Sequence, residues 1–97
     1  MRGHKSSTSD LHAHISDALR SGRVAEALDL CEQIERRKPD EPRWSHRKGD
    51  LLRRMGRTVD AEMAYQRAAE LYAAKGFEAR AAATAKMMQQ IQADPPA

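Results

Sequence analysis

The sequence holds little of what small secreted domains and membrane proteins depend on. Of its 97 residues only Cys31 is a cysteine, so no disulfide can form within the chain. A reducing compartment is the simpler setting for such a chain. The first residues have no apolar run of the kind a secretory signal needs, and no stretch approaches the roughly 20 apolar residues that span a bilayer. These absences predict a soluble, cytoplasmic protein.

Aromatic side chains are also scarce, at one tryptophan, two tyrosines and one phenylalanine. Tyr65, Tyr72 and Phe77 fall at apolar helical spacings, which places them in a core and argues against a platform for stacking nucleobases. The net charge is +3, a mildly basic balance. It favours anionic partners as a class without separating phosphate from acidic protein.

The residues that could support catalysis or bind a metal are isolated from one another. His12 and His14 are two positions apart, so on a helix their side chains point in different directions. No pair of carboxylates has the local context of an acid–base couple. Cys31 lies on an apolar stripe where a small hydrophobic residue fits, so we expect it in the core. We therefore expect no enzymatic activity, no cofactor and no metal.

Apolar periodicity predicts five helices and no strand, because no segment alternates with period 2. Ser9 or Asp10 is the expected N-cap of the first helix, and Thr58 that of the fourth. Glycines end three of the helices, and Pro39 with Pro42 separates the second from the third. The expected helices run from about 9 to 20, 24 to 37, 43 to 55, 59 to 75 and 77 to 93.

Each of the first four helices has an apolar stripe that should face a shared core. The inward residues expected on the four helices are Leu11, Ile15, Ala18 and Leu19; Val24, Ala27, Leu28, Cys31 and Ile34; Trp44, Lys48, Leu51, Leu52 and Met55; and Ala61, Ala64, Tyr65, Ala68, Leu71 and Tyr72.

The chain also repeats itself. Gly22-Arg23 recurs as Gly56-Arg57, 34 residues later. The same offset aligns Ala27 with Ala61 and Cys31 with Tyr65. A period of 34 residues is that of a helix–turn–helix repeat.

With these residues the sequence resembles the tetratricopeptide-repeat family. The likeness rests on turn glycines, small packing residues, bulky core residues and a terminating proline: Gly22, Ala27 and Pro39 in one unit, and Gly49, Gly56, Ala61, Tyr65 and Ala68 in the next. The resemblance implies a short right-handed superhelix of antiparallel helix pairs over residues 9–93. Its repeats would cover about 8–41 and 42–75, followed by a C-terminal helix over about 77–93. Residues 1–8 would form a disordered tail and residues 94–97 a frayed end. The fourth helix would serve twice, also pairing with the fifth.

Basic residues concentrate in the second repeat, with eight basic and four acidic side chains between residues 42 and 76. In the family that the chain resembles, the first helix of each unit lines a concave binding groove. The resemblance therefore implies an adaptor that captures a partner segment, and the basic excess favours an acidic one. The residues expected to line its groove are Arg43, His46, Arg47, Asp50, Arg53 and Arg54, with His12 and Arg20 beside them.

Three other interpretations stay open. The arginines could form a solvated face with pairs inside the helix, such as Asp50 with Arg54. They could contact nucleic acid, the less favoured alternative. The last helix could also make a homodimer or meet a partner helix, because small residues and methionines suit close and irregular contacts. Its expected contact residues are Ala79, Ala83, Met87, Met88 and Ile91.

Overall fold

Five α-helices make up the computed structural model, which describes residues 7–93 and the side chains of residues 7–92. No strand occurs in this part of the chain, so the predicted all-α class with five helices is confirmed. None of the five is long and apolar enough to cross a bilayer. The helices are α1 (Thr8–Arg20), α2 (Val24–Arg37), α3 (Pro42–Arg54), α4 (Thr58–Ala74) and α5 (Glu78–Ala93).

Two of the expected helix caps were wrong. The N-cap of α1 is Ser7, whose Oγ accepts a hydrogen bond from the backbone N–H of Asp10, while the Asp10 carboxylate accepts one from the Ser7 N–H. This reciprocal capping box places Asp10 three residues into the helix. Residues 7 and 8, expected in the tail, therefore belong to the start of α1. Thr58 is the first residue of α4, and its N-cap is Arg57, which makes no side-chain cap.

Three of the four turns are built alike. After α1, α3 and α4, a glycine takes a positive φ, between 76° and 83°. The next residue then donates its N–H to the carbonyl five positions back, as in Arg57 to Leu52 at 2.9 Å and Phe77 to Tyr72 at 2.8 Å. This is the Schellman pattern, and glycine adopts the required conformation without strain. The turn after α2 differs, because Pro42 opens α3.

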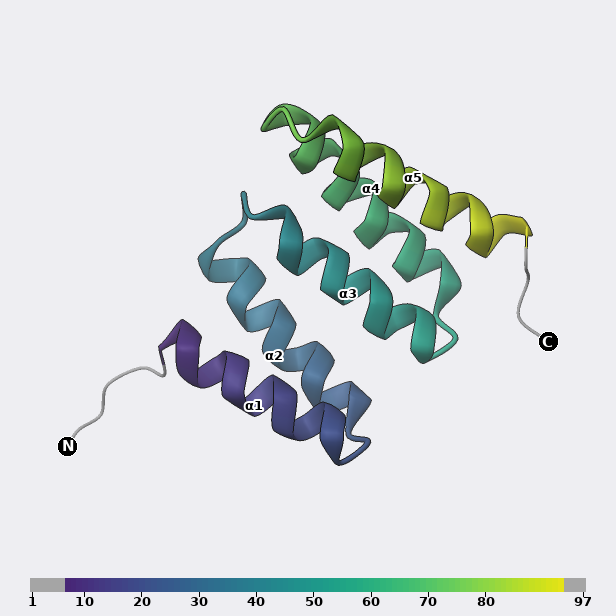
Figure 1. Cartoon of the computed structure of the whole chain (residues 1–97). Helices are drawn as coiled ribbons and strands as arrows, with labels where there is room; N and C mark the ends of the chain where they lie inside the picture. Colours follow the sequence, from purple (N-terminus) through teal and green to yellow (C-terminus); the bar gives the residue numbers. More distant parts are fainter. Residues whose placement is uncertain (1–6, 94–97) are drawn as a thin grey trace.

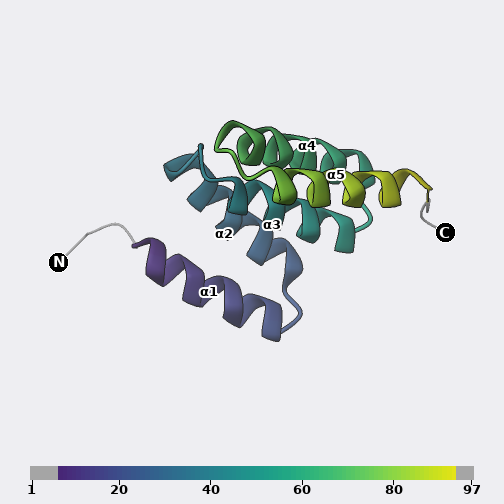
Figure 2. The same cartoon turned by 45° about the horizontal axis from the view of Figure 1, so that its top comes forward.

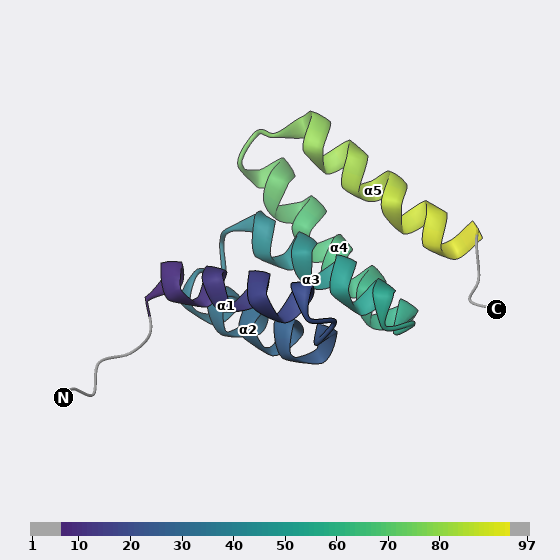
Figure 3. The same cartoon turned by 60° about the horizontal axis from the view of Figure 1, so that its bottom comes forward.

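Consecutive helices run antiparallel and pack on one another in chain order (Figure 1). Helices α1, α3 and α5 form one layer, and α2 and α4 form the layer behind it, as Figures 1 and 2 show together. Helices α1 and α5 lie at opposite ends of the stack (Figure 3). Each interior helix is therefore covered on two sides, whereas α1 and α5 are each covered mainly by one neighbour.

The core lies between the layers and follows the predicted stripes. Cys31, Ile34, Trp44 and Tyr65 are fully buried in it, as expected. Met55 was expected to face inward but is 37% exposed, because α3 ends there and Met55 is its C-cap. Phe77 is 50% exposed, because it lies in the turn before α5.

The close packing of α3 against α4 depends on Gly49. A Cβ atom at this position would lie 2.8 Å from two ring carbons of Tyr65, closer than nonbonded carbons approach. The absence of a side chain at Gly49 therefore lets the Tyr65 ring lie against the backbone of α3. The sequence predicted a close helix crossing at this glycine, and the contact confirms it.

Candidate functional site: a cleft between α1 and α3

A cleft of about 200 Å³ opens between α1 and α3. Its floor is apolar, with Ile15 and Leu51 buried and Leu19 half-buried. Helices α1 and α3 lie in the same layer, and both direct apolar side chains at α2. These side chains therefore meet at the bottom of the cleft. We call this surface the α1–α3 cleft; its lining residues are Ile15, Leu19, Cys31, Arg47, Asp50, Leu51 and Arg54.

The polar wall of the α1–α3 cleft comes from α3. Arg47, Asp50 and Arg54 project from one side of the helix because their spacing of three and four residues returns to the same face. Arg47 and Arg54 are exposed and, among the described residues, neither forms an ion pair. Their seven-residue spacing corresponds to about 10 Å along the helix axis. Two cationic groups thus flank an apolar floor.

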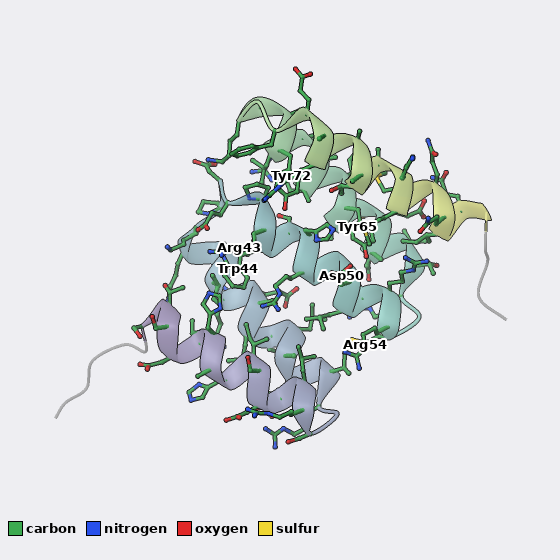
Figure 4. The ribbon with its side chains drawn as sticks, viewed as in Figure 1. Arg43, Trp44, Asp50, Arg54, Tyr65 and Tyr72 are labelled. Carbon is green, nitrogen blue, oxygen red and sulfur yellow. The ribbon has the colours of Figure 1, made fainter. Side chains whose placement is uncertain are left out.

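Asp50 does not neutralise these arginines. Its carboxylate accepts a hydrogen bond from the Tyr65 hydroxyl of α4 at 2.5 Å, and its other oxygen lies 3.8 Å from Nδ1 of His46. The pairing of Asp50 with Arg54, one of the interpretations from sequence, is absent from the described ion pairs. Burial and the hydrogen bond to Asp50 raise the pKa of Tyr65, so its hydroxyl stays protonated and keeps donating. Figure 4 shows Arg43, Asp50 and Arg54 along α3.

Arg43 and His12 lie at the N-terminal end of α3, around Trp44. The Arg43 guanidinium is 5.0 Å from the centre of the Trp44 ring and pairs with Glu41 at 2.9 Å. The His12 ring meets Trp44 edge-on, with 4.6 Å between the ring centres. Burial, with the nearby charges of Arg43 and Arg47, lowers the pKa of His12 below its ordinary value of 6.5. This end is a packed cluster beside the cleft.

His46 and Arg53 lie on the flank of α3 that faces α4 and α5. The His46 ring is half-buried, 5.5 Å from the ring of Tyr65, and its Nε2 lies 3.3 Å from Sδ of Met87. Arg53 is half-buried beside the Tyr65 hydroxyl. Arg20 is exposed and paired with Asp17 at 2.6 Å. The structure therefore brings together Arg47, Asp50 and Arg54 of the predicted groove residues, and distributes the others around them.

The predicted contact face of α5 is divided between the interior and the surface. Ile91 is only 4% exposed and belongs to the core, so its expected place on an open face was wrong. Met87 and Met88 are half-buried against the core. Ala79 and Ala83 are exposed. The larger apolar side chains of α5 therefore face the other helices, and the exposed residues of the predicted contact face are alanines.

The described residues differ in the chemistry that each can support. They contain no cluster of three or more His, Cys, Asp or Glu side chains that could hold a metal ion. Burial raises the pKa of the Cys31 thiol to about 11, so at neutral pH it is a protonated thiol and a poor nucleophile. The exposed guanidiniums of the cleft can instead form paired hydrogen bonds to a carboxylate.

A network that sequence reasoning missed anchors α3 on α2. Glu35 of α2 accepts hydrogen bonds from the Ser45 hydroxyl at 3.0 Å and from the Lys48 ammonium at 3.2 Å, and Lys48 also lies 3.6 Å from Glu32. The signal in the sequence is that Ser45 and Lys48 are polar residues at inward-facing positions of α3. These contacts occupy Lys48 and leave the arginines of the opposite face available.

Comparison with family models, with curated proteins and with solved structures gives no match for this chain.

Proposed function

We propose that the chain is a protein-interaction module that holds an acidic segment of a partner protein in the α1–α3 cleft. The observation that carries the proposal is the pair of exposed, unneutralised guanidiniums of Arg47 and Arg54 above an apolar floor. A carboxylate can accept two parallel hydrogen bonds from each guanidinium, which fixes its direction as well as its charge.

The shape of the cleft narrows the class of segment. Arg47 and Arg54 are seven residues apart on α3, so their backbone positions are separated by about 10 Å along the helix axis, a length that an extended peptide covers in about three residues. The apolar surface of Leu19 and Leu51 lies in the same cleft. A segment with two carboxylates separated by an apolar side chain could therefore place its carboxylates at the two arginines and its apolar side chain on the cleft floor. Nucleic acid matches the arginines but leaves the apolar floor without a counterpart.

We also propose that the chain is built from tetratricopeptide-like repeats. Three observations support this: the turns at Gly22 and Gly56 share one geometry 34 residues apart, the helices alternate between two layers, and Gly49 lies against Tyr65. The turn after α4 repeats the same geometry, in keeping with a fourth helix that pairs on both sides.

Charge reversal in the cleft tests the proposed function. The probe is a fluorescein-labelled Glu-rich peptide with leucines between the glutamates, and binding is followed by fluorescence anisotropy. Arg47→Glu with Arg54→Glu should weaken binding by about tenfold or more, because each arginine contributes a charge-assisted contact. The two side chains are exposed, so circular dichroism should show unchanged helicity.

A matched control separates the cleft from net charge. Arg36→Glu with Lys86→Glu changes the total charge equally, at exposed positions of α2 and α5. The control protein should bind the Glu-rich peptide with nearly wild-type affinity. A peptide with glutamine in place of glutamate should bind neither the wild type nor the control protein. Equal losses in the two charge-reversed proteins would reject the α1–α3 cleft as the binding site.

A further inference from the structure

The last helical hairpin carries an apolar surface that the α1–α3 cleft does not use. Val59 and Met63 of α4 are 68% and 67% exposed, although their side chains are large and apolar. They are four residues apart and so lie on the same face of α4. With Met88 of α5 they line a shallow depression of about 420 Å³ with mostly apolar walls. We call this surface the α4–α5 face.

The rim of the α4–α5 face carries more acidic than basic charge. Glu62 and Glu70 border the depression, together with Gln66 and Arg67. Glu62 accepts a hydrogen bond from the Gln92 amide at 2.7 Å, and Glu70 accepts one from the Gln66 amide at 2.9 Å. Among the described residues neither carboxylate forms an ion pair, so both are held in place by amide hydrogen bonds without a direct cationic partner.

The exposed apolar residues and the flanking carboxylates together indicate which kind of partner fits the α4–α5 face. We propose that the α4–α5 face docks an amphipathic helix of a partner protein, with an apolar stripe flanked by lysine or arginine. The apolar stripe would cover Val59, Met63 and Met88, and the basic flanks would meet Glu62 and Glu70. An anionic membrane surface is disfavoured, because the two carboxylates would face its phosphates. The proposal does not rest on the α1–α3 cleft, whose charge is opposite.

A second docking surface of opposite charge changes what the molecule can do. The α1–α3 cleft is cationic and opens on the layer of α1 and α3, whereas the α4–α5 face is formed at the other end of the stack. The two share no lining residue. One copy of the chain could therefore hold an acidic segment and a basic helix at the same time, and so bring two partners together.

The test uses a designed helix as the probe. It is a fluorescein-labelled peptide of about 18 residues, long enough to be helical by itself, with leucines on one face and lysines on the other. Val59→Gln with Met63→Gln removes the apolar contact at two exposed positions and should weaken binding about tenfold or more. Arg47→Glu with Arg54→Glu should bind this probe at least as well as the wild type.

A charge swap keeps the proposal falsifiable if the apolar variant is perturbed. Glu62→Lys with Glu70→Lys should weaken binding of the lysine peptide and strengthen binding of a matched peptide with glutamates in place of lysines. Unchanged affinity in the Val59→Gln, Met63→Gln protein would overturn the proposal, and so would equal binding of the two peptides to the wild type. Sedimentation gives one more outcome. If the wild type is a dimer and the two glutamine substitutions dissociate it, the occupant of the α4–α5 face is a second copy of the chain, and the proposal is overturned.

Discussion

Gly49 shows how one missing side chain shapes the molecule. Two carbons of the Tyr65 ring lie 2.8 Å from where a Cβ atom of residue 49 would be, and the hydroxyl of the same side chain donates a hydrogen bond to Asp50. The position of Tyr65 thus links the core to the polar face of α3. The Asp50 carboxylate accepts its hydrogen bond from Tyr65, and it forms no described ion pair with Arg47 or Arg54 of the α1–α3 cleft.

Gly49→Ala should destabilise the fold by about 1–3 kcal/mol, since the added methyl overpacks a buried crossing. In an ordinary helix the same substitution is favourable by about 1 kcal/mol, so the sign of the effect is diagnostic. Urea unfolding followed by circular dichroism gives the free energy of unfolding. A Gly49→Ala protein as stable as the wild type would mean that α3 and α4 are not in this close contact.

His12 predicts a pH dependence of stability. Burial against Trp44 and the charges of Arg43 and Arg47 lower its pKa in the folded state, so the unfolded chain binds a proton more readily. The free energy of unfolding should therefore fall as pH drops below 6.5, the ordinary value, toward the lowered folded pKa. Urea unfolding between about pH 7 and pH 5 covers this window.

His12→Gln should flatten that pH profile, because the titrating group is gone. His14→Gln is the matched control, an exposed histidine on the same helix. If the wild type and the His12→Gln protein lose stability in parallel as the pH falls, His12 is not the group responsible.

At the scale of helices, the sequence predicted the features that follow from periodic spacing and missed those that depend on a contact between two particular residues. Helix faces and glycine turns follow from spacing within one segment, and the stripes of α1 and α4 are buried much as expected. The capping box at Ser7 was missed because several adjacent residues of α1 are good caps, and only the position of Asp10 selects among them. Met55 and Phe77 fit an apolar period but lie where a helix ends or has not begun.

The site was harder to predict than the helices, because it depends on which neighbouring residue each polar side chain contacts. Arg47, Asp50 and Arg54 follow from helical spacing on α3. Spacing alone also allows Asp50 to pair with Arg54, and only the position of α4 shows that Tyr65 takes the Asp50 carboxylate. Arg43 and His12 contact Trp44; the sequence placed Trp44 in the core but did not show which side chains would lie over its ring.

The link between α4 and α3 gives a prediction at this scale. Tyr65→Phe keeps the ring beside Gly49 and removes only the hydroxyl, so it should cost about 1 kcal/mol of stability. Asp50 would then be free to pair with Arg54, which should weaken binding of the Glu-rich peptide. Denaturation and anisotropy measure the two effects. Full retention of peptide affinity in the Tyr65→Phe protein would show that Tyr65 does not control the charge of the cleft.

Across the whole molecule, stacking in chain order produces surfaces of different character. Interior helices bury apolar residues on both sides, whereas a cleft remains where α1 and α3 meet and an apolar depression remains on the last hairpin. The cationic α1–α3 cleft and the acidic α4–α5 face lie on different helices and have different lining residues.

The most direct measurement of where an acidic segment binds is a titration of the isotope-labelled protein with the Glu-rich peptide, followed by two-dimensional NMR. The proposed function predicts that the largest shift changes fall on amides around Leu19, Arg47, Leu51 and Arg54, with little change along the outer side of α4. Shift changes centred on α4 and α5, or none at peptide concentrations that saturate the anisotropy signal, would contradict it.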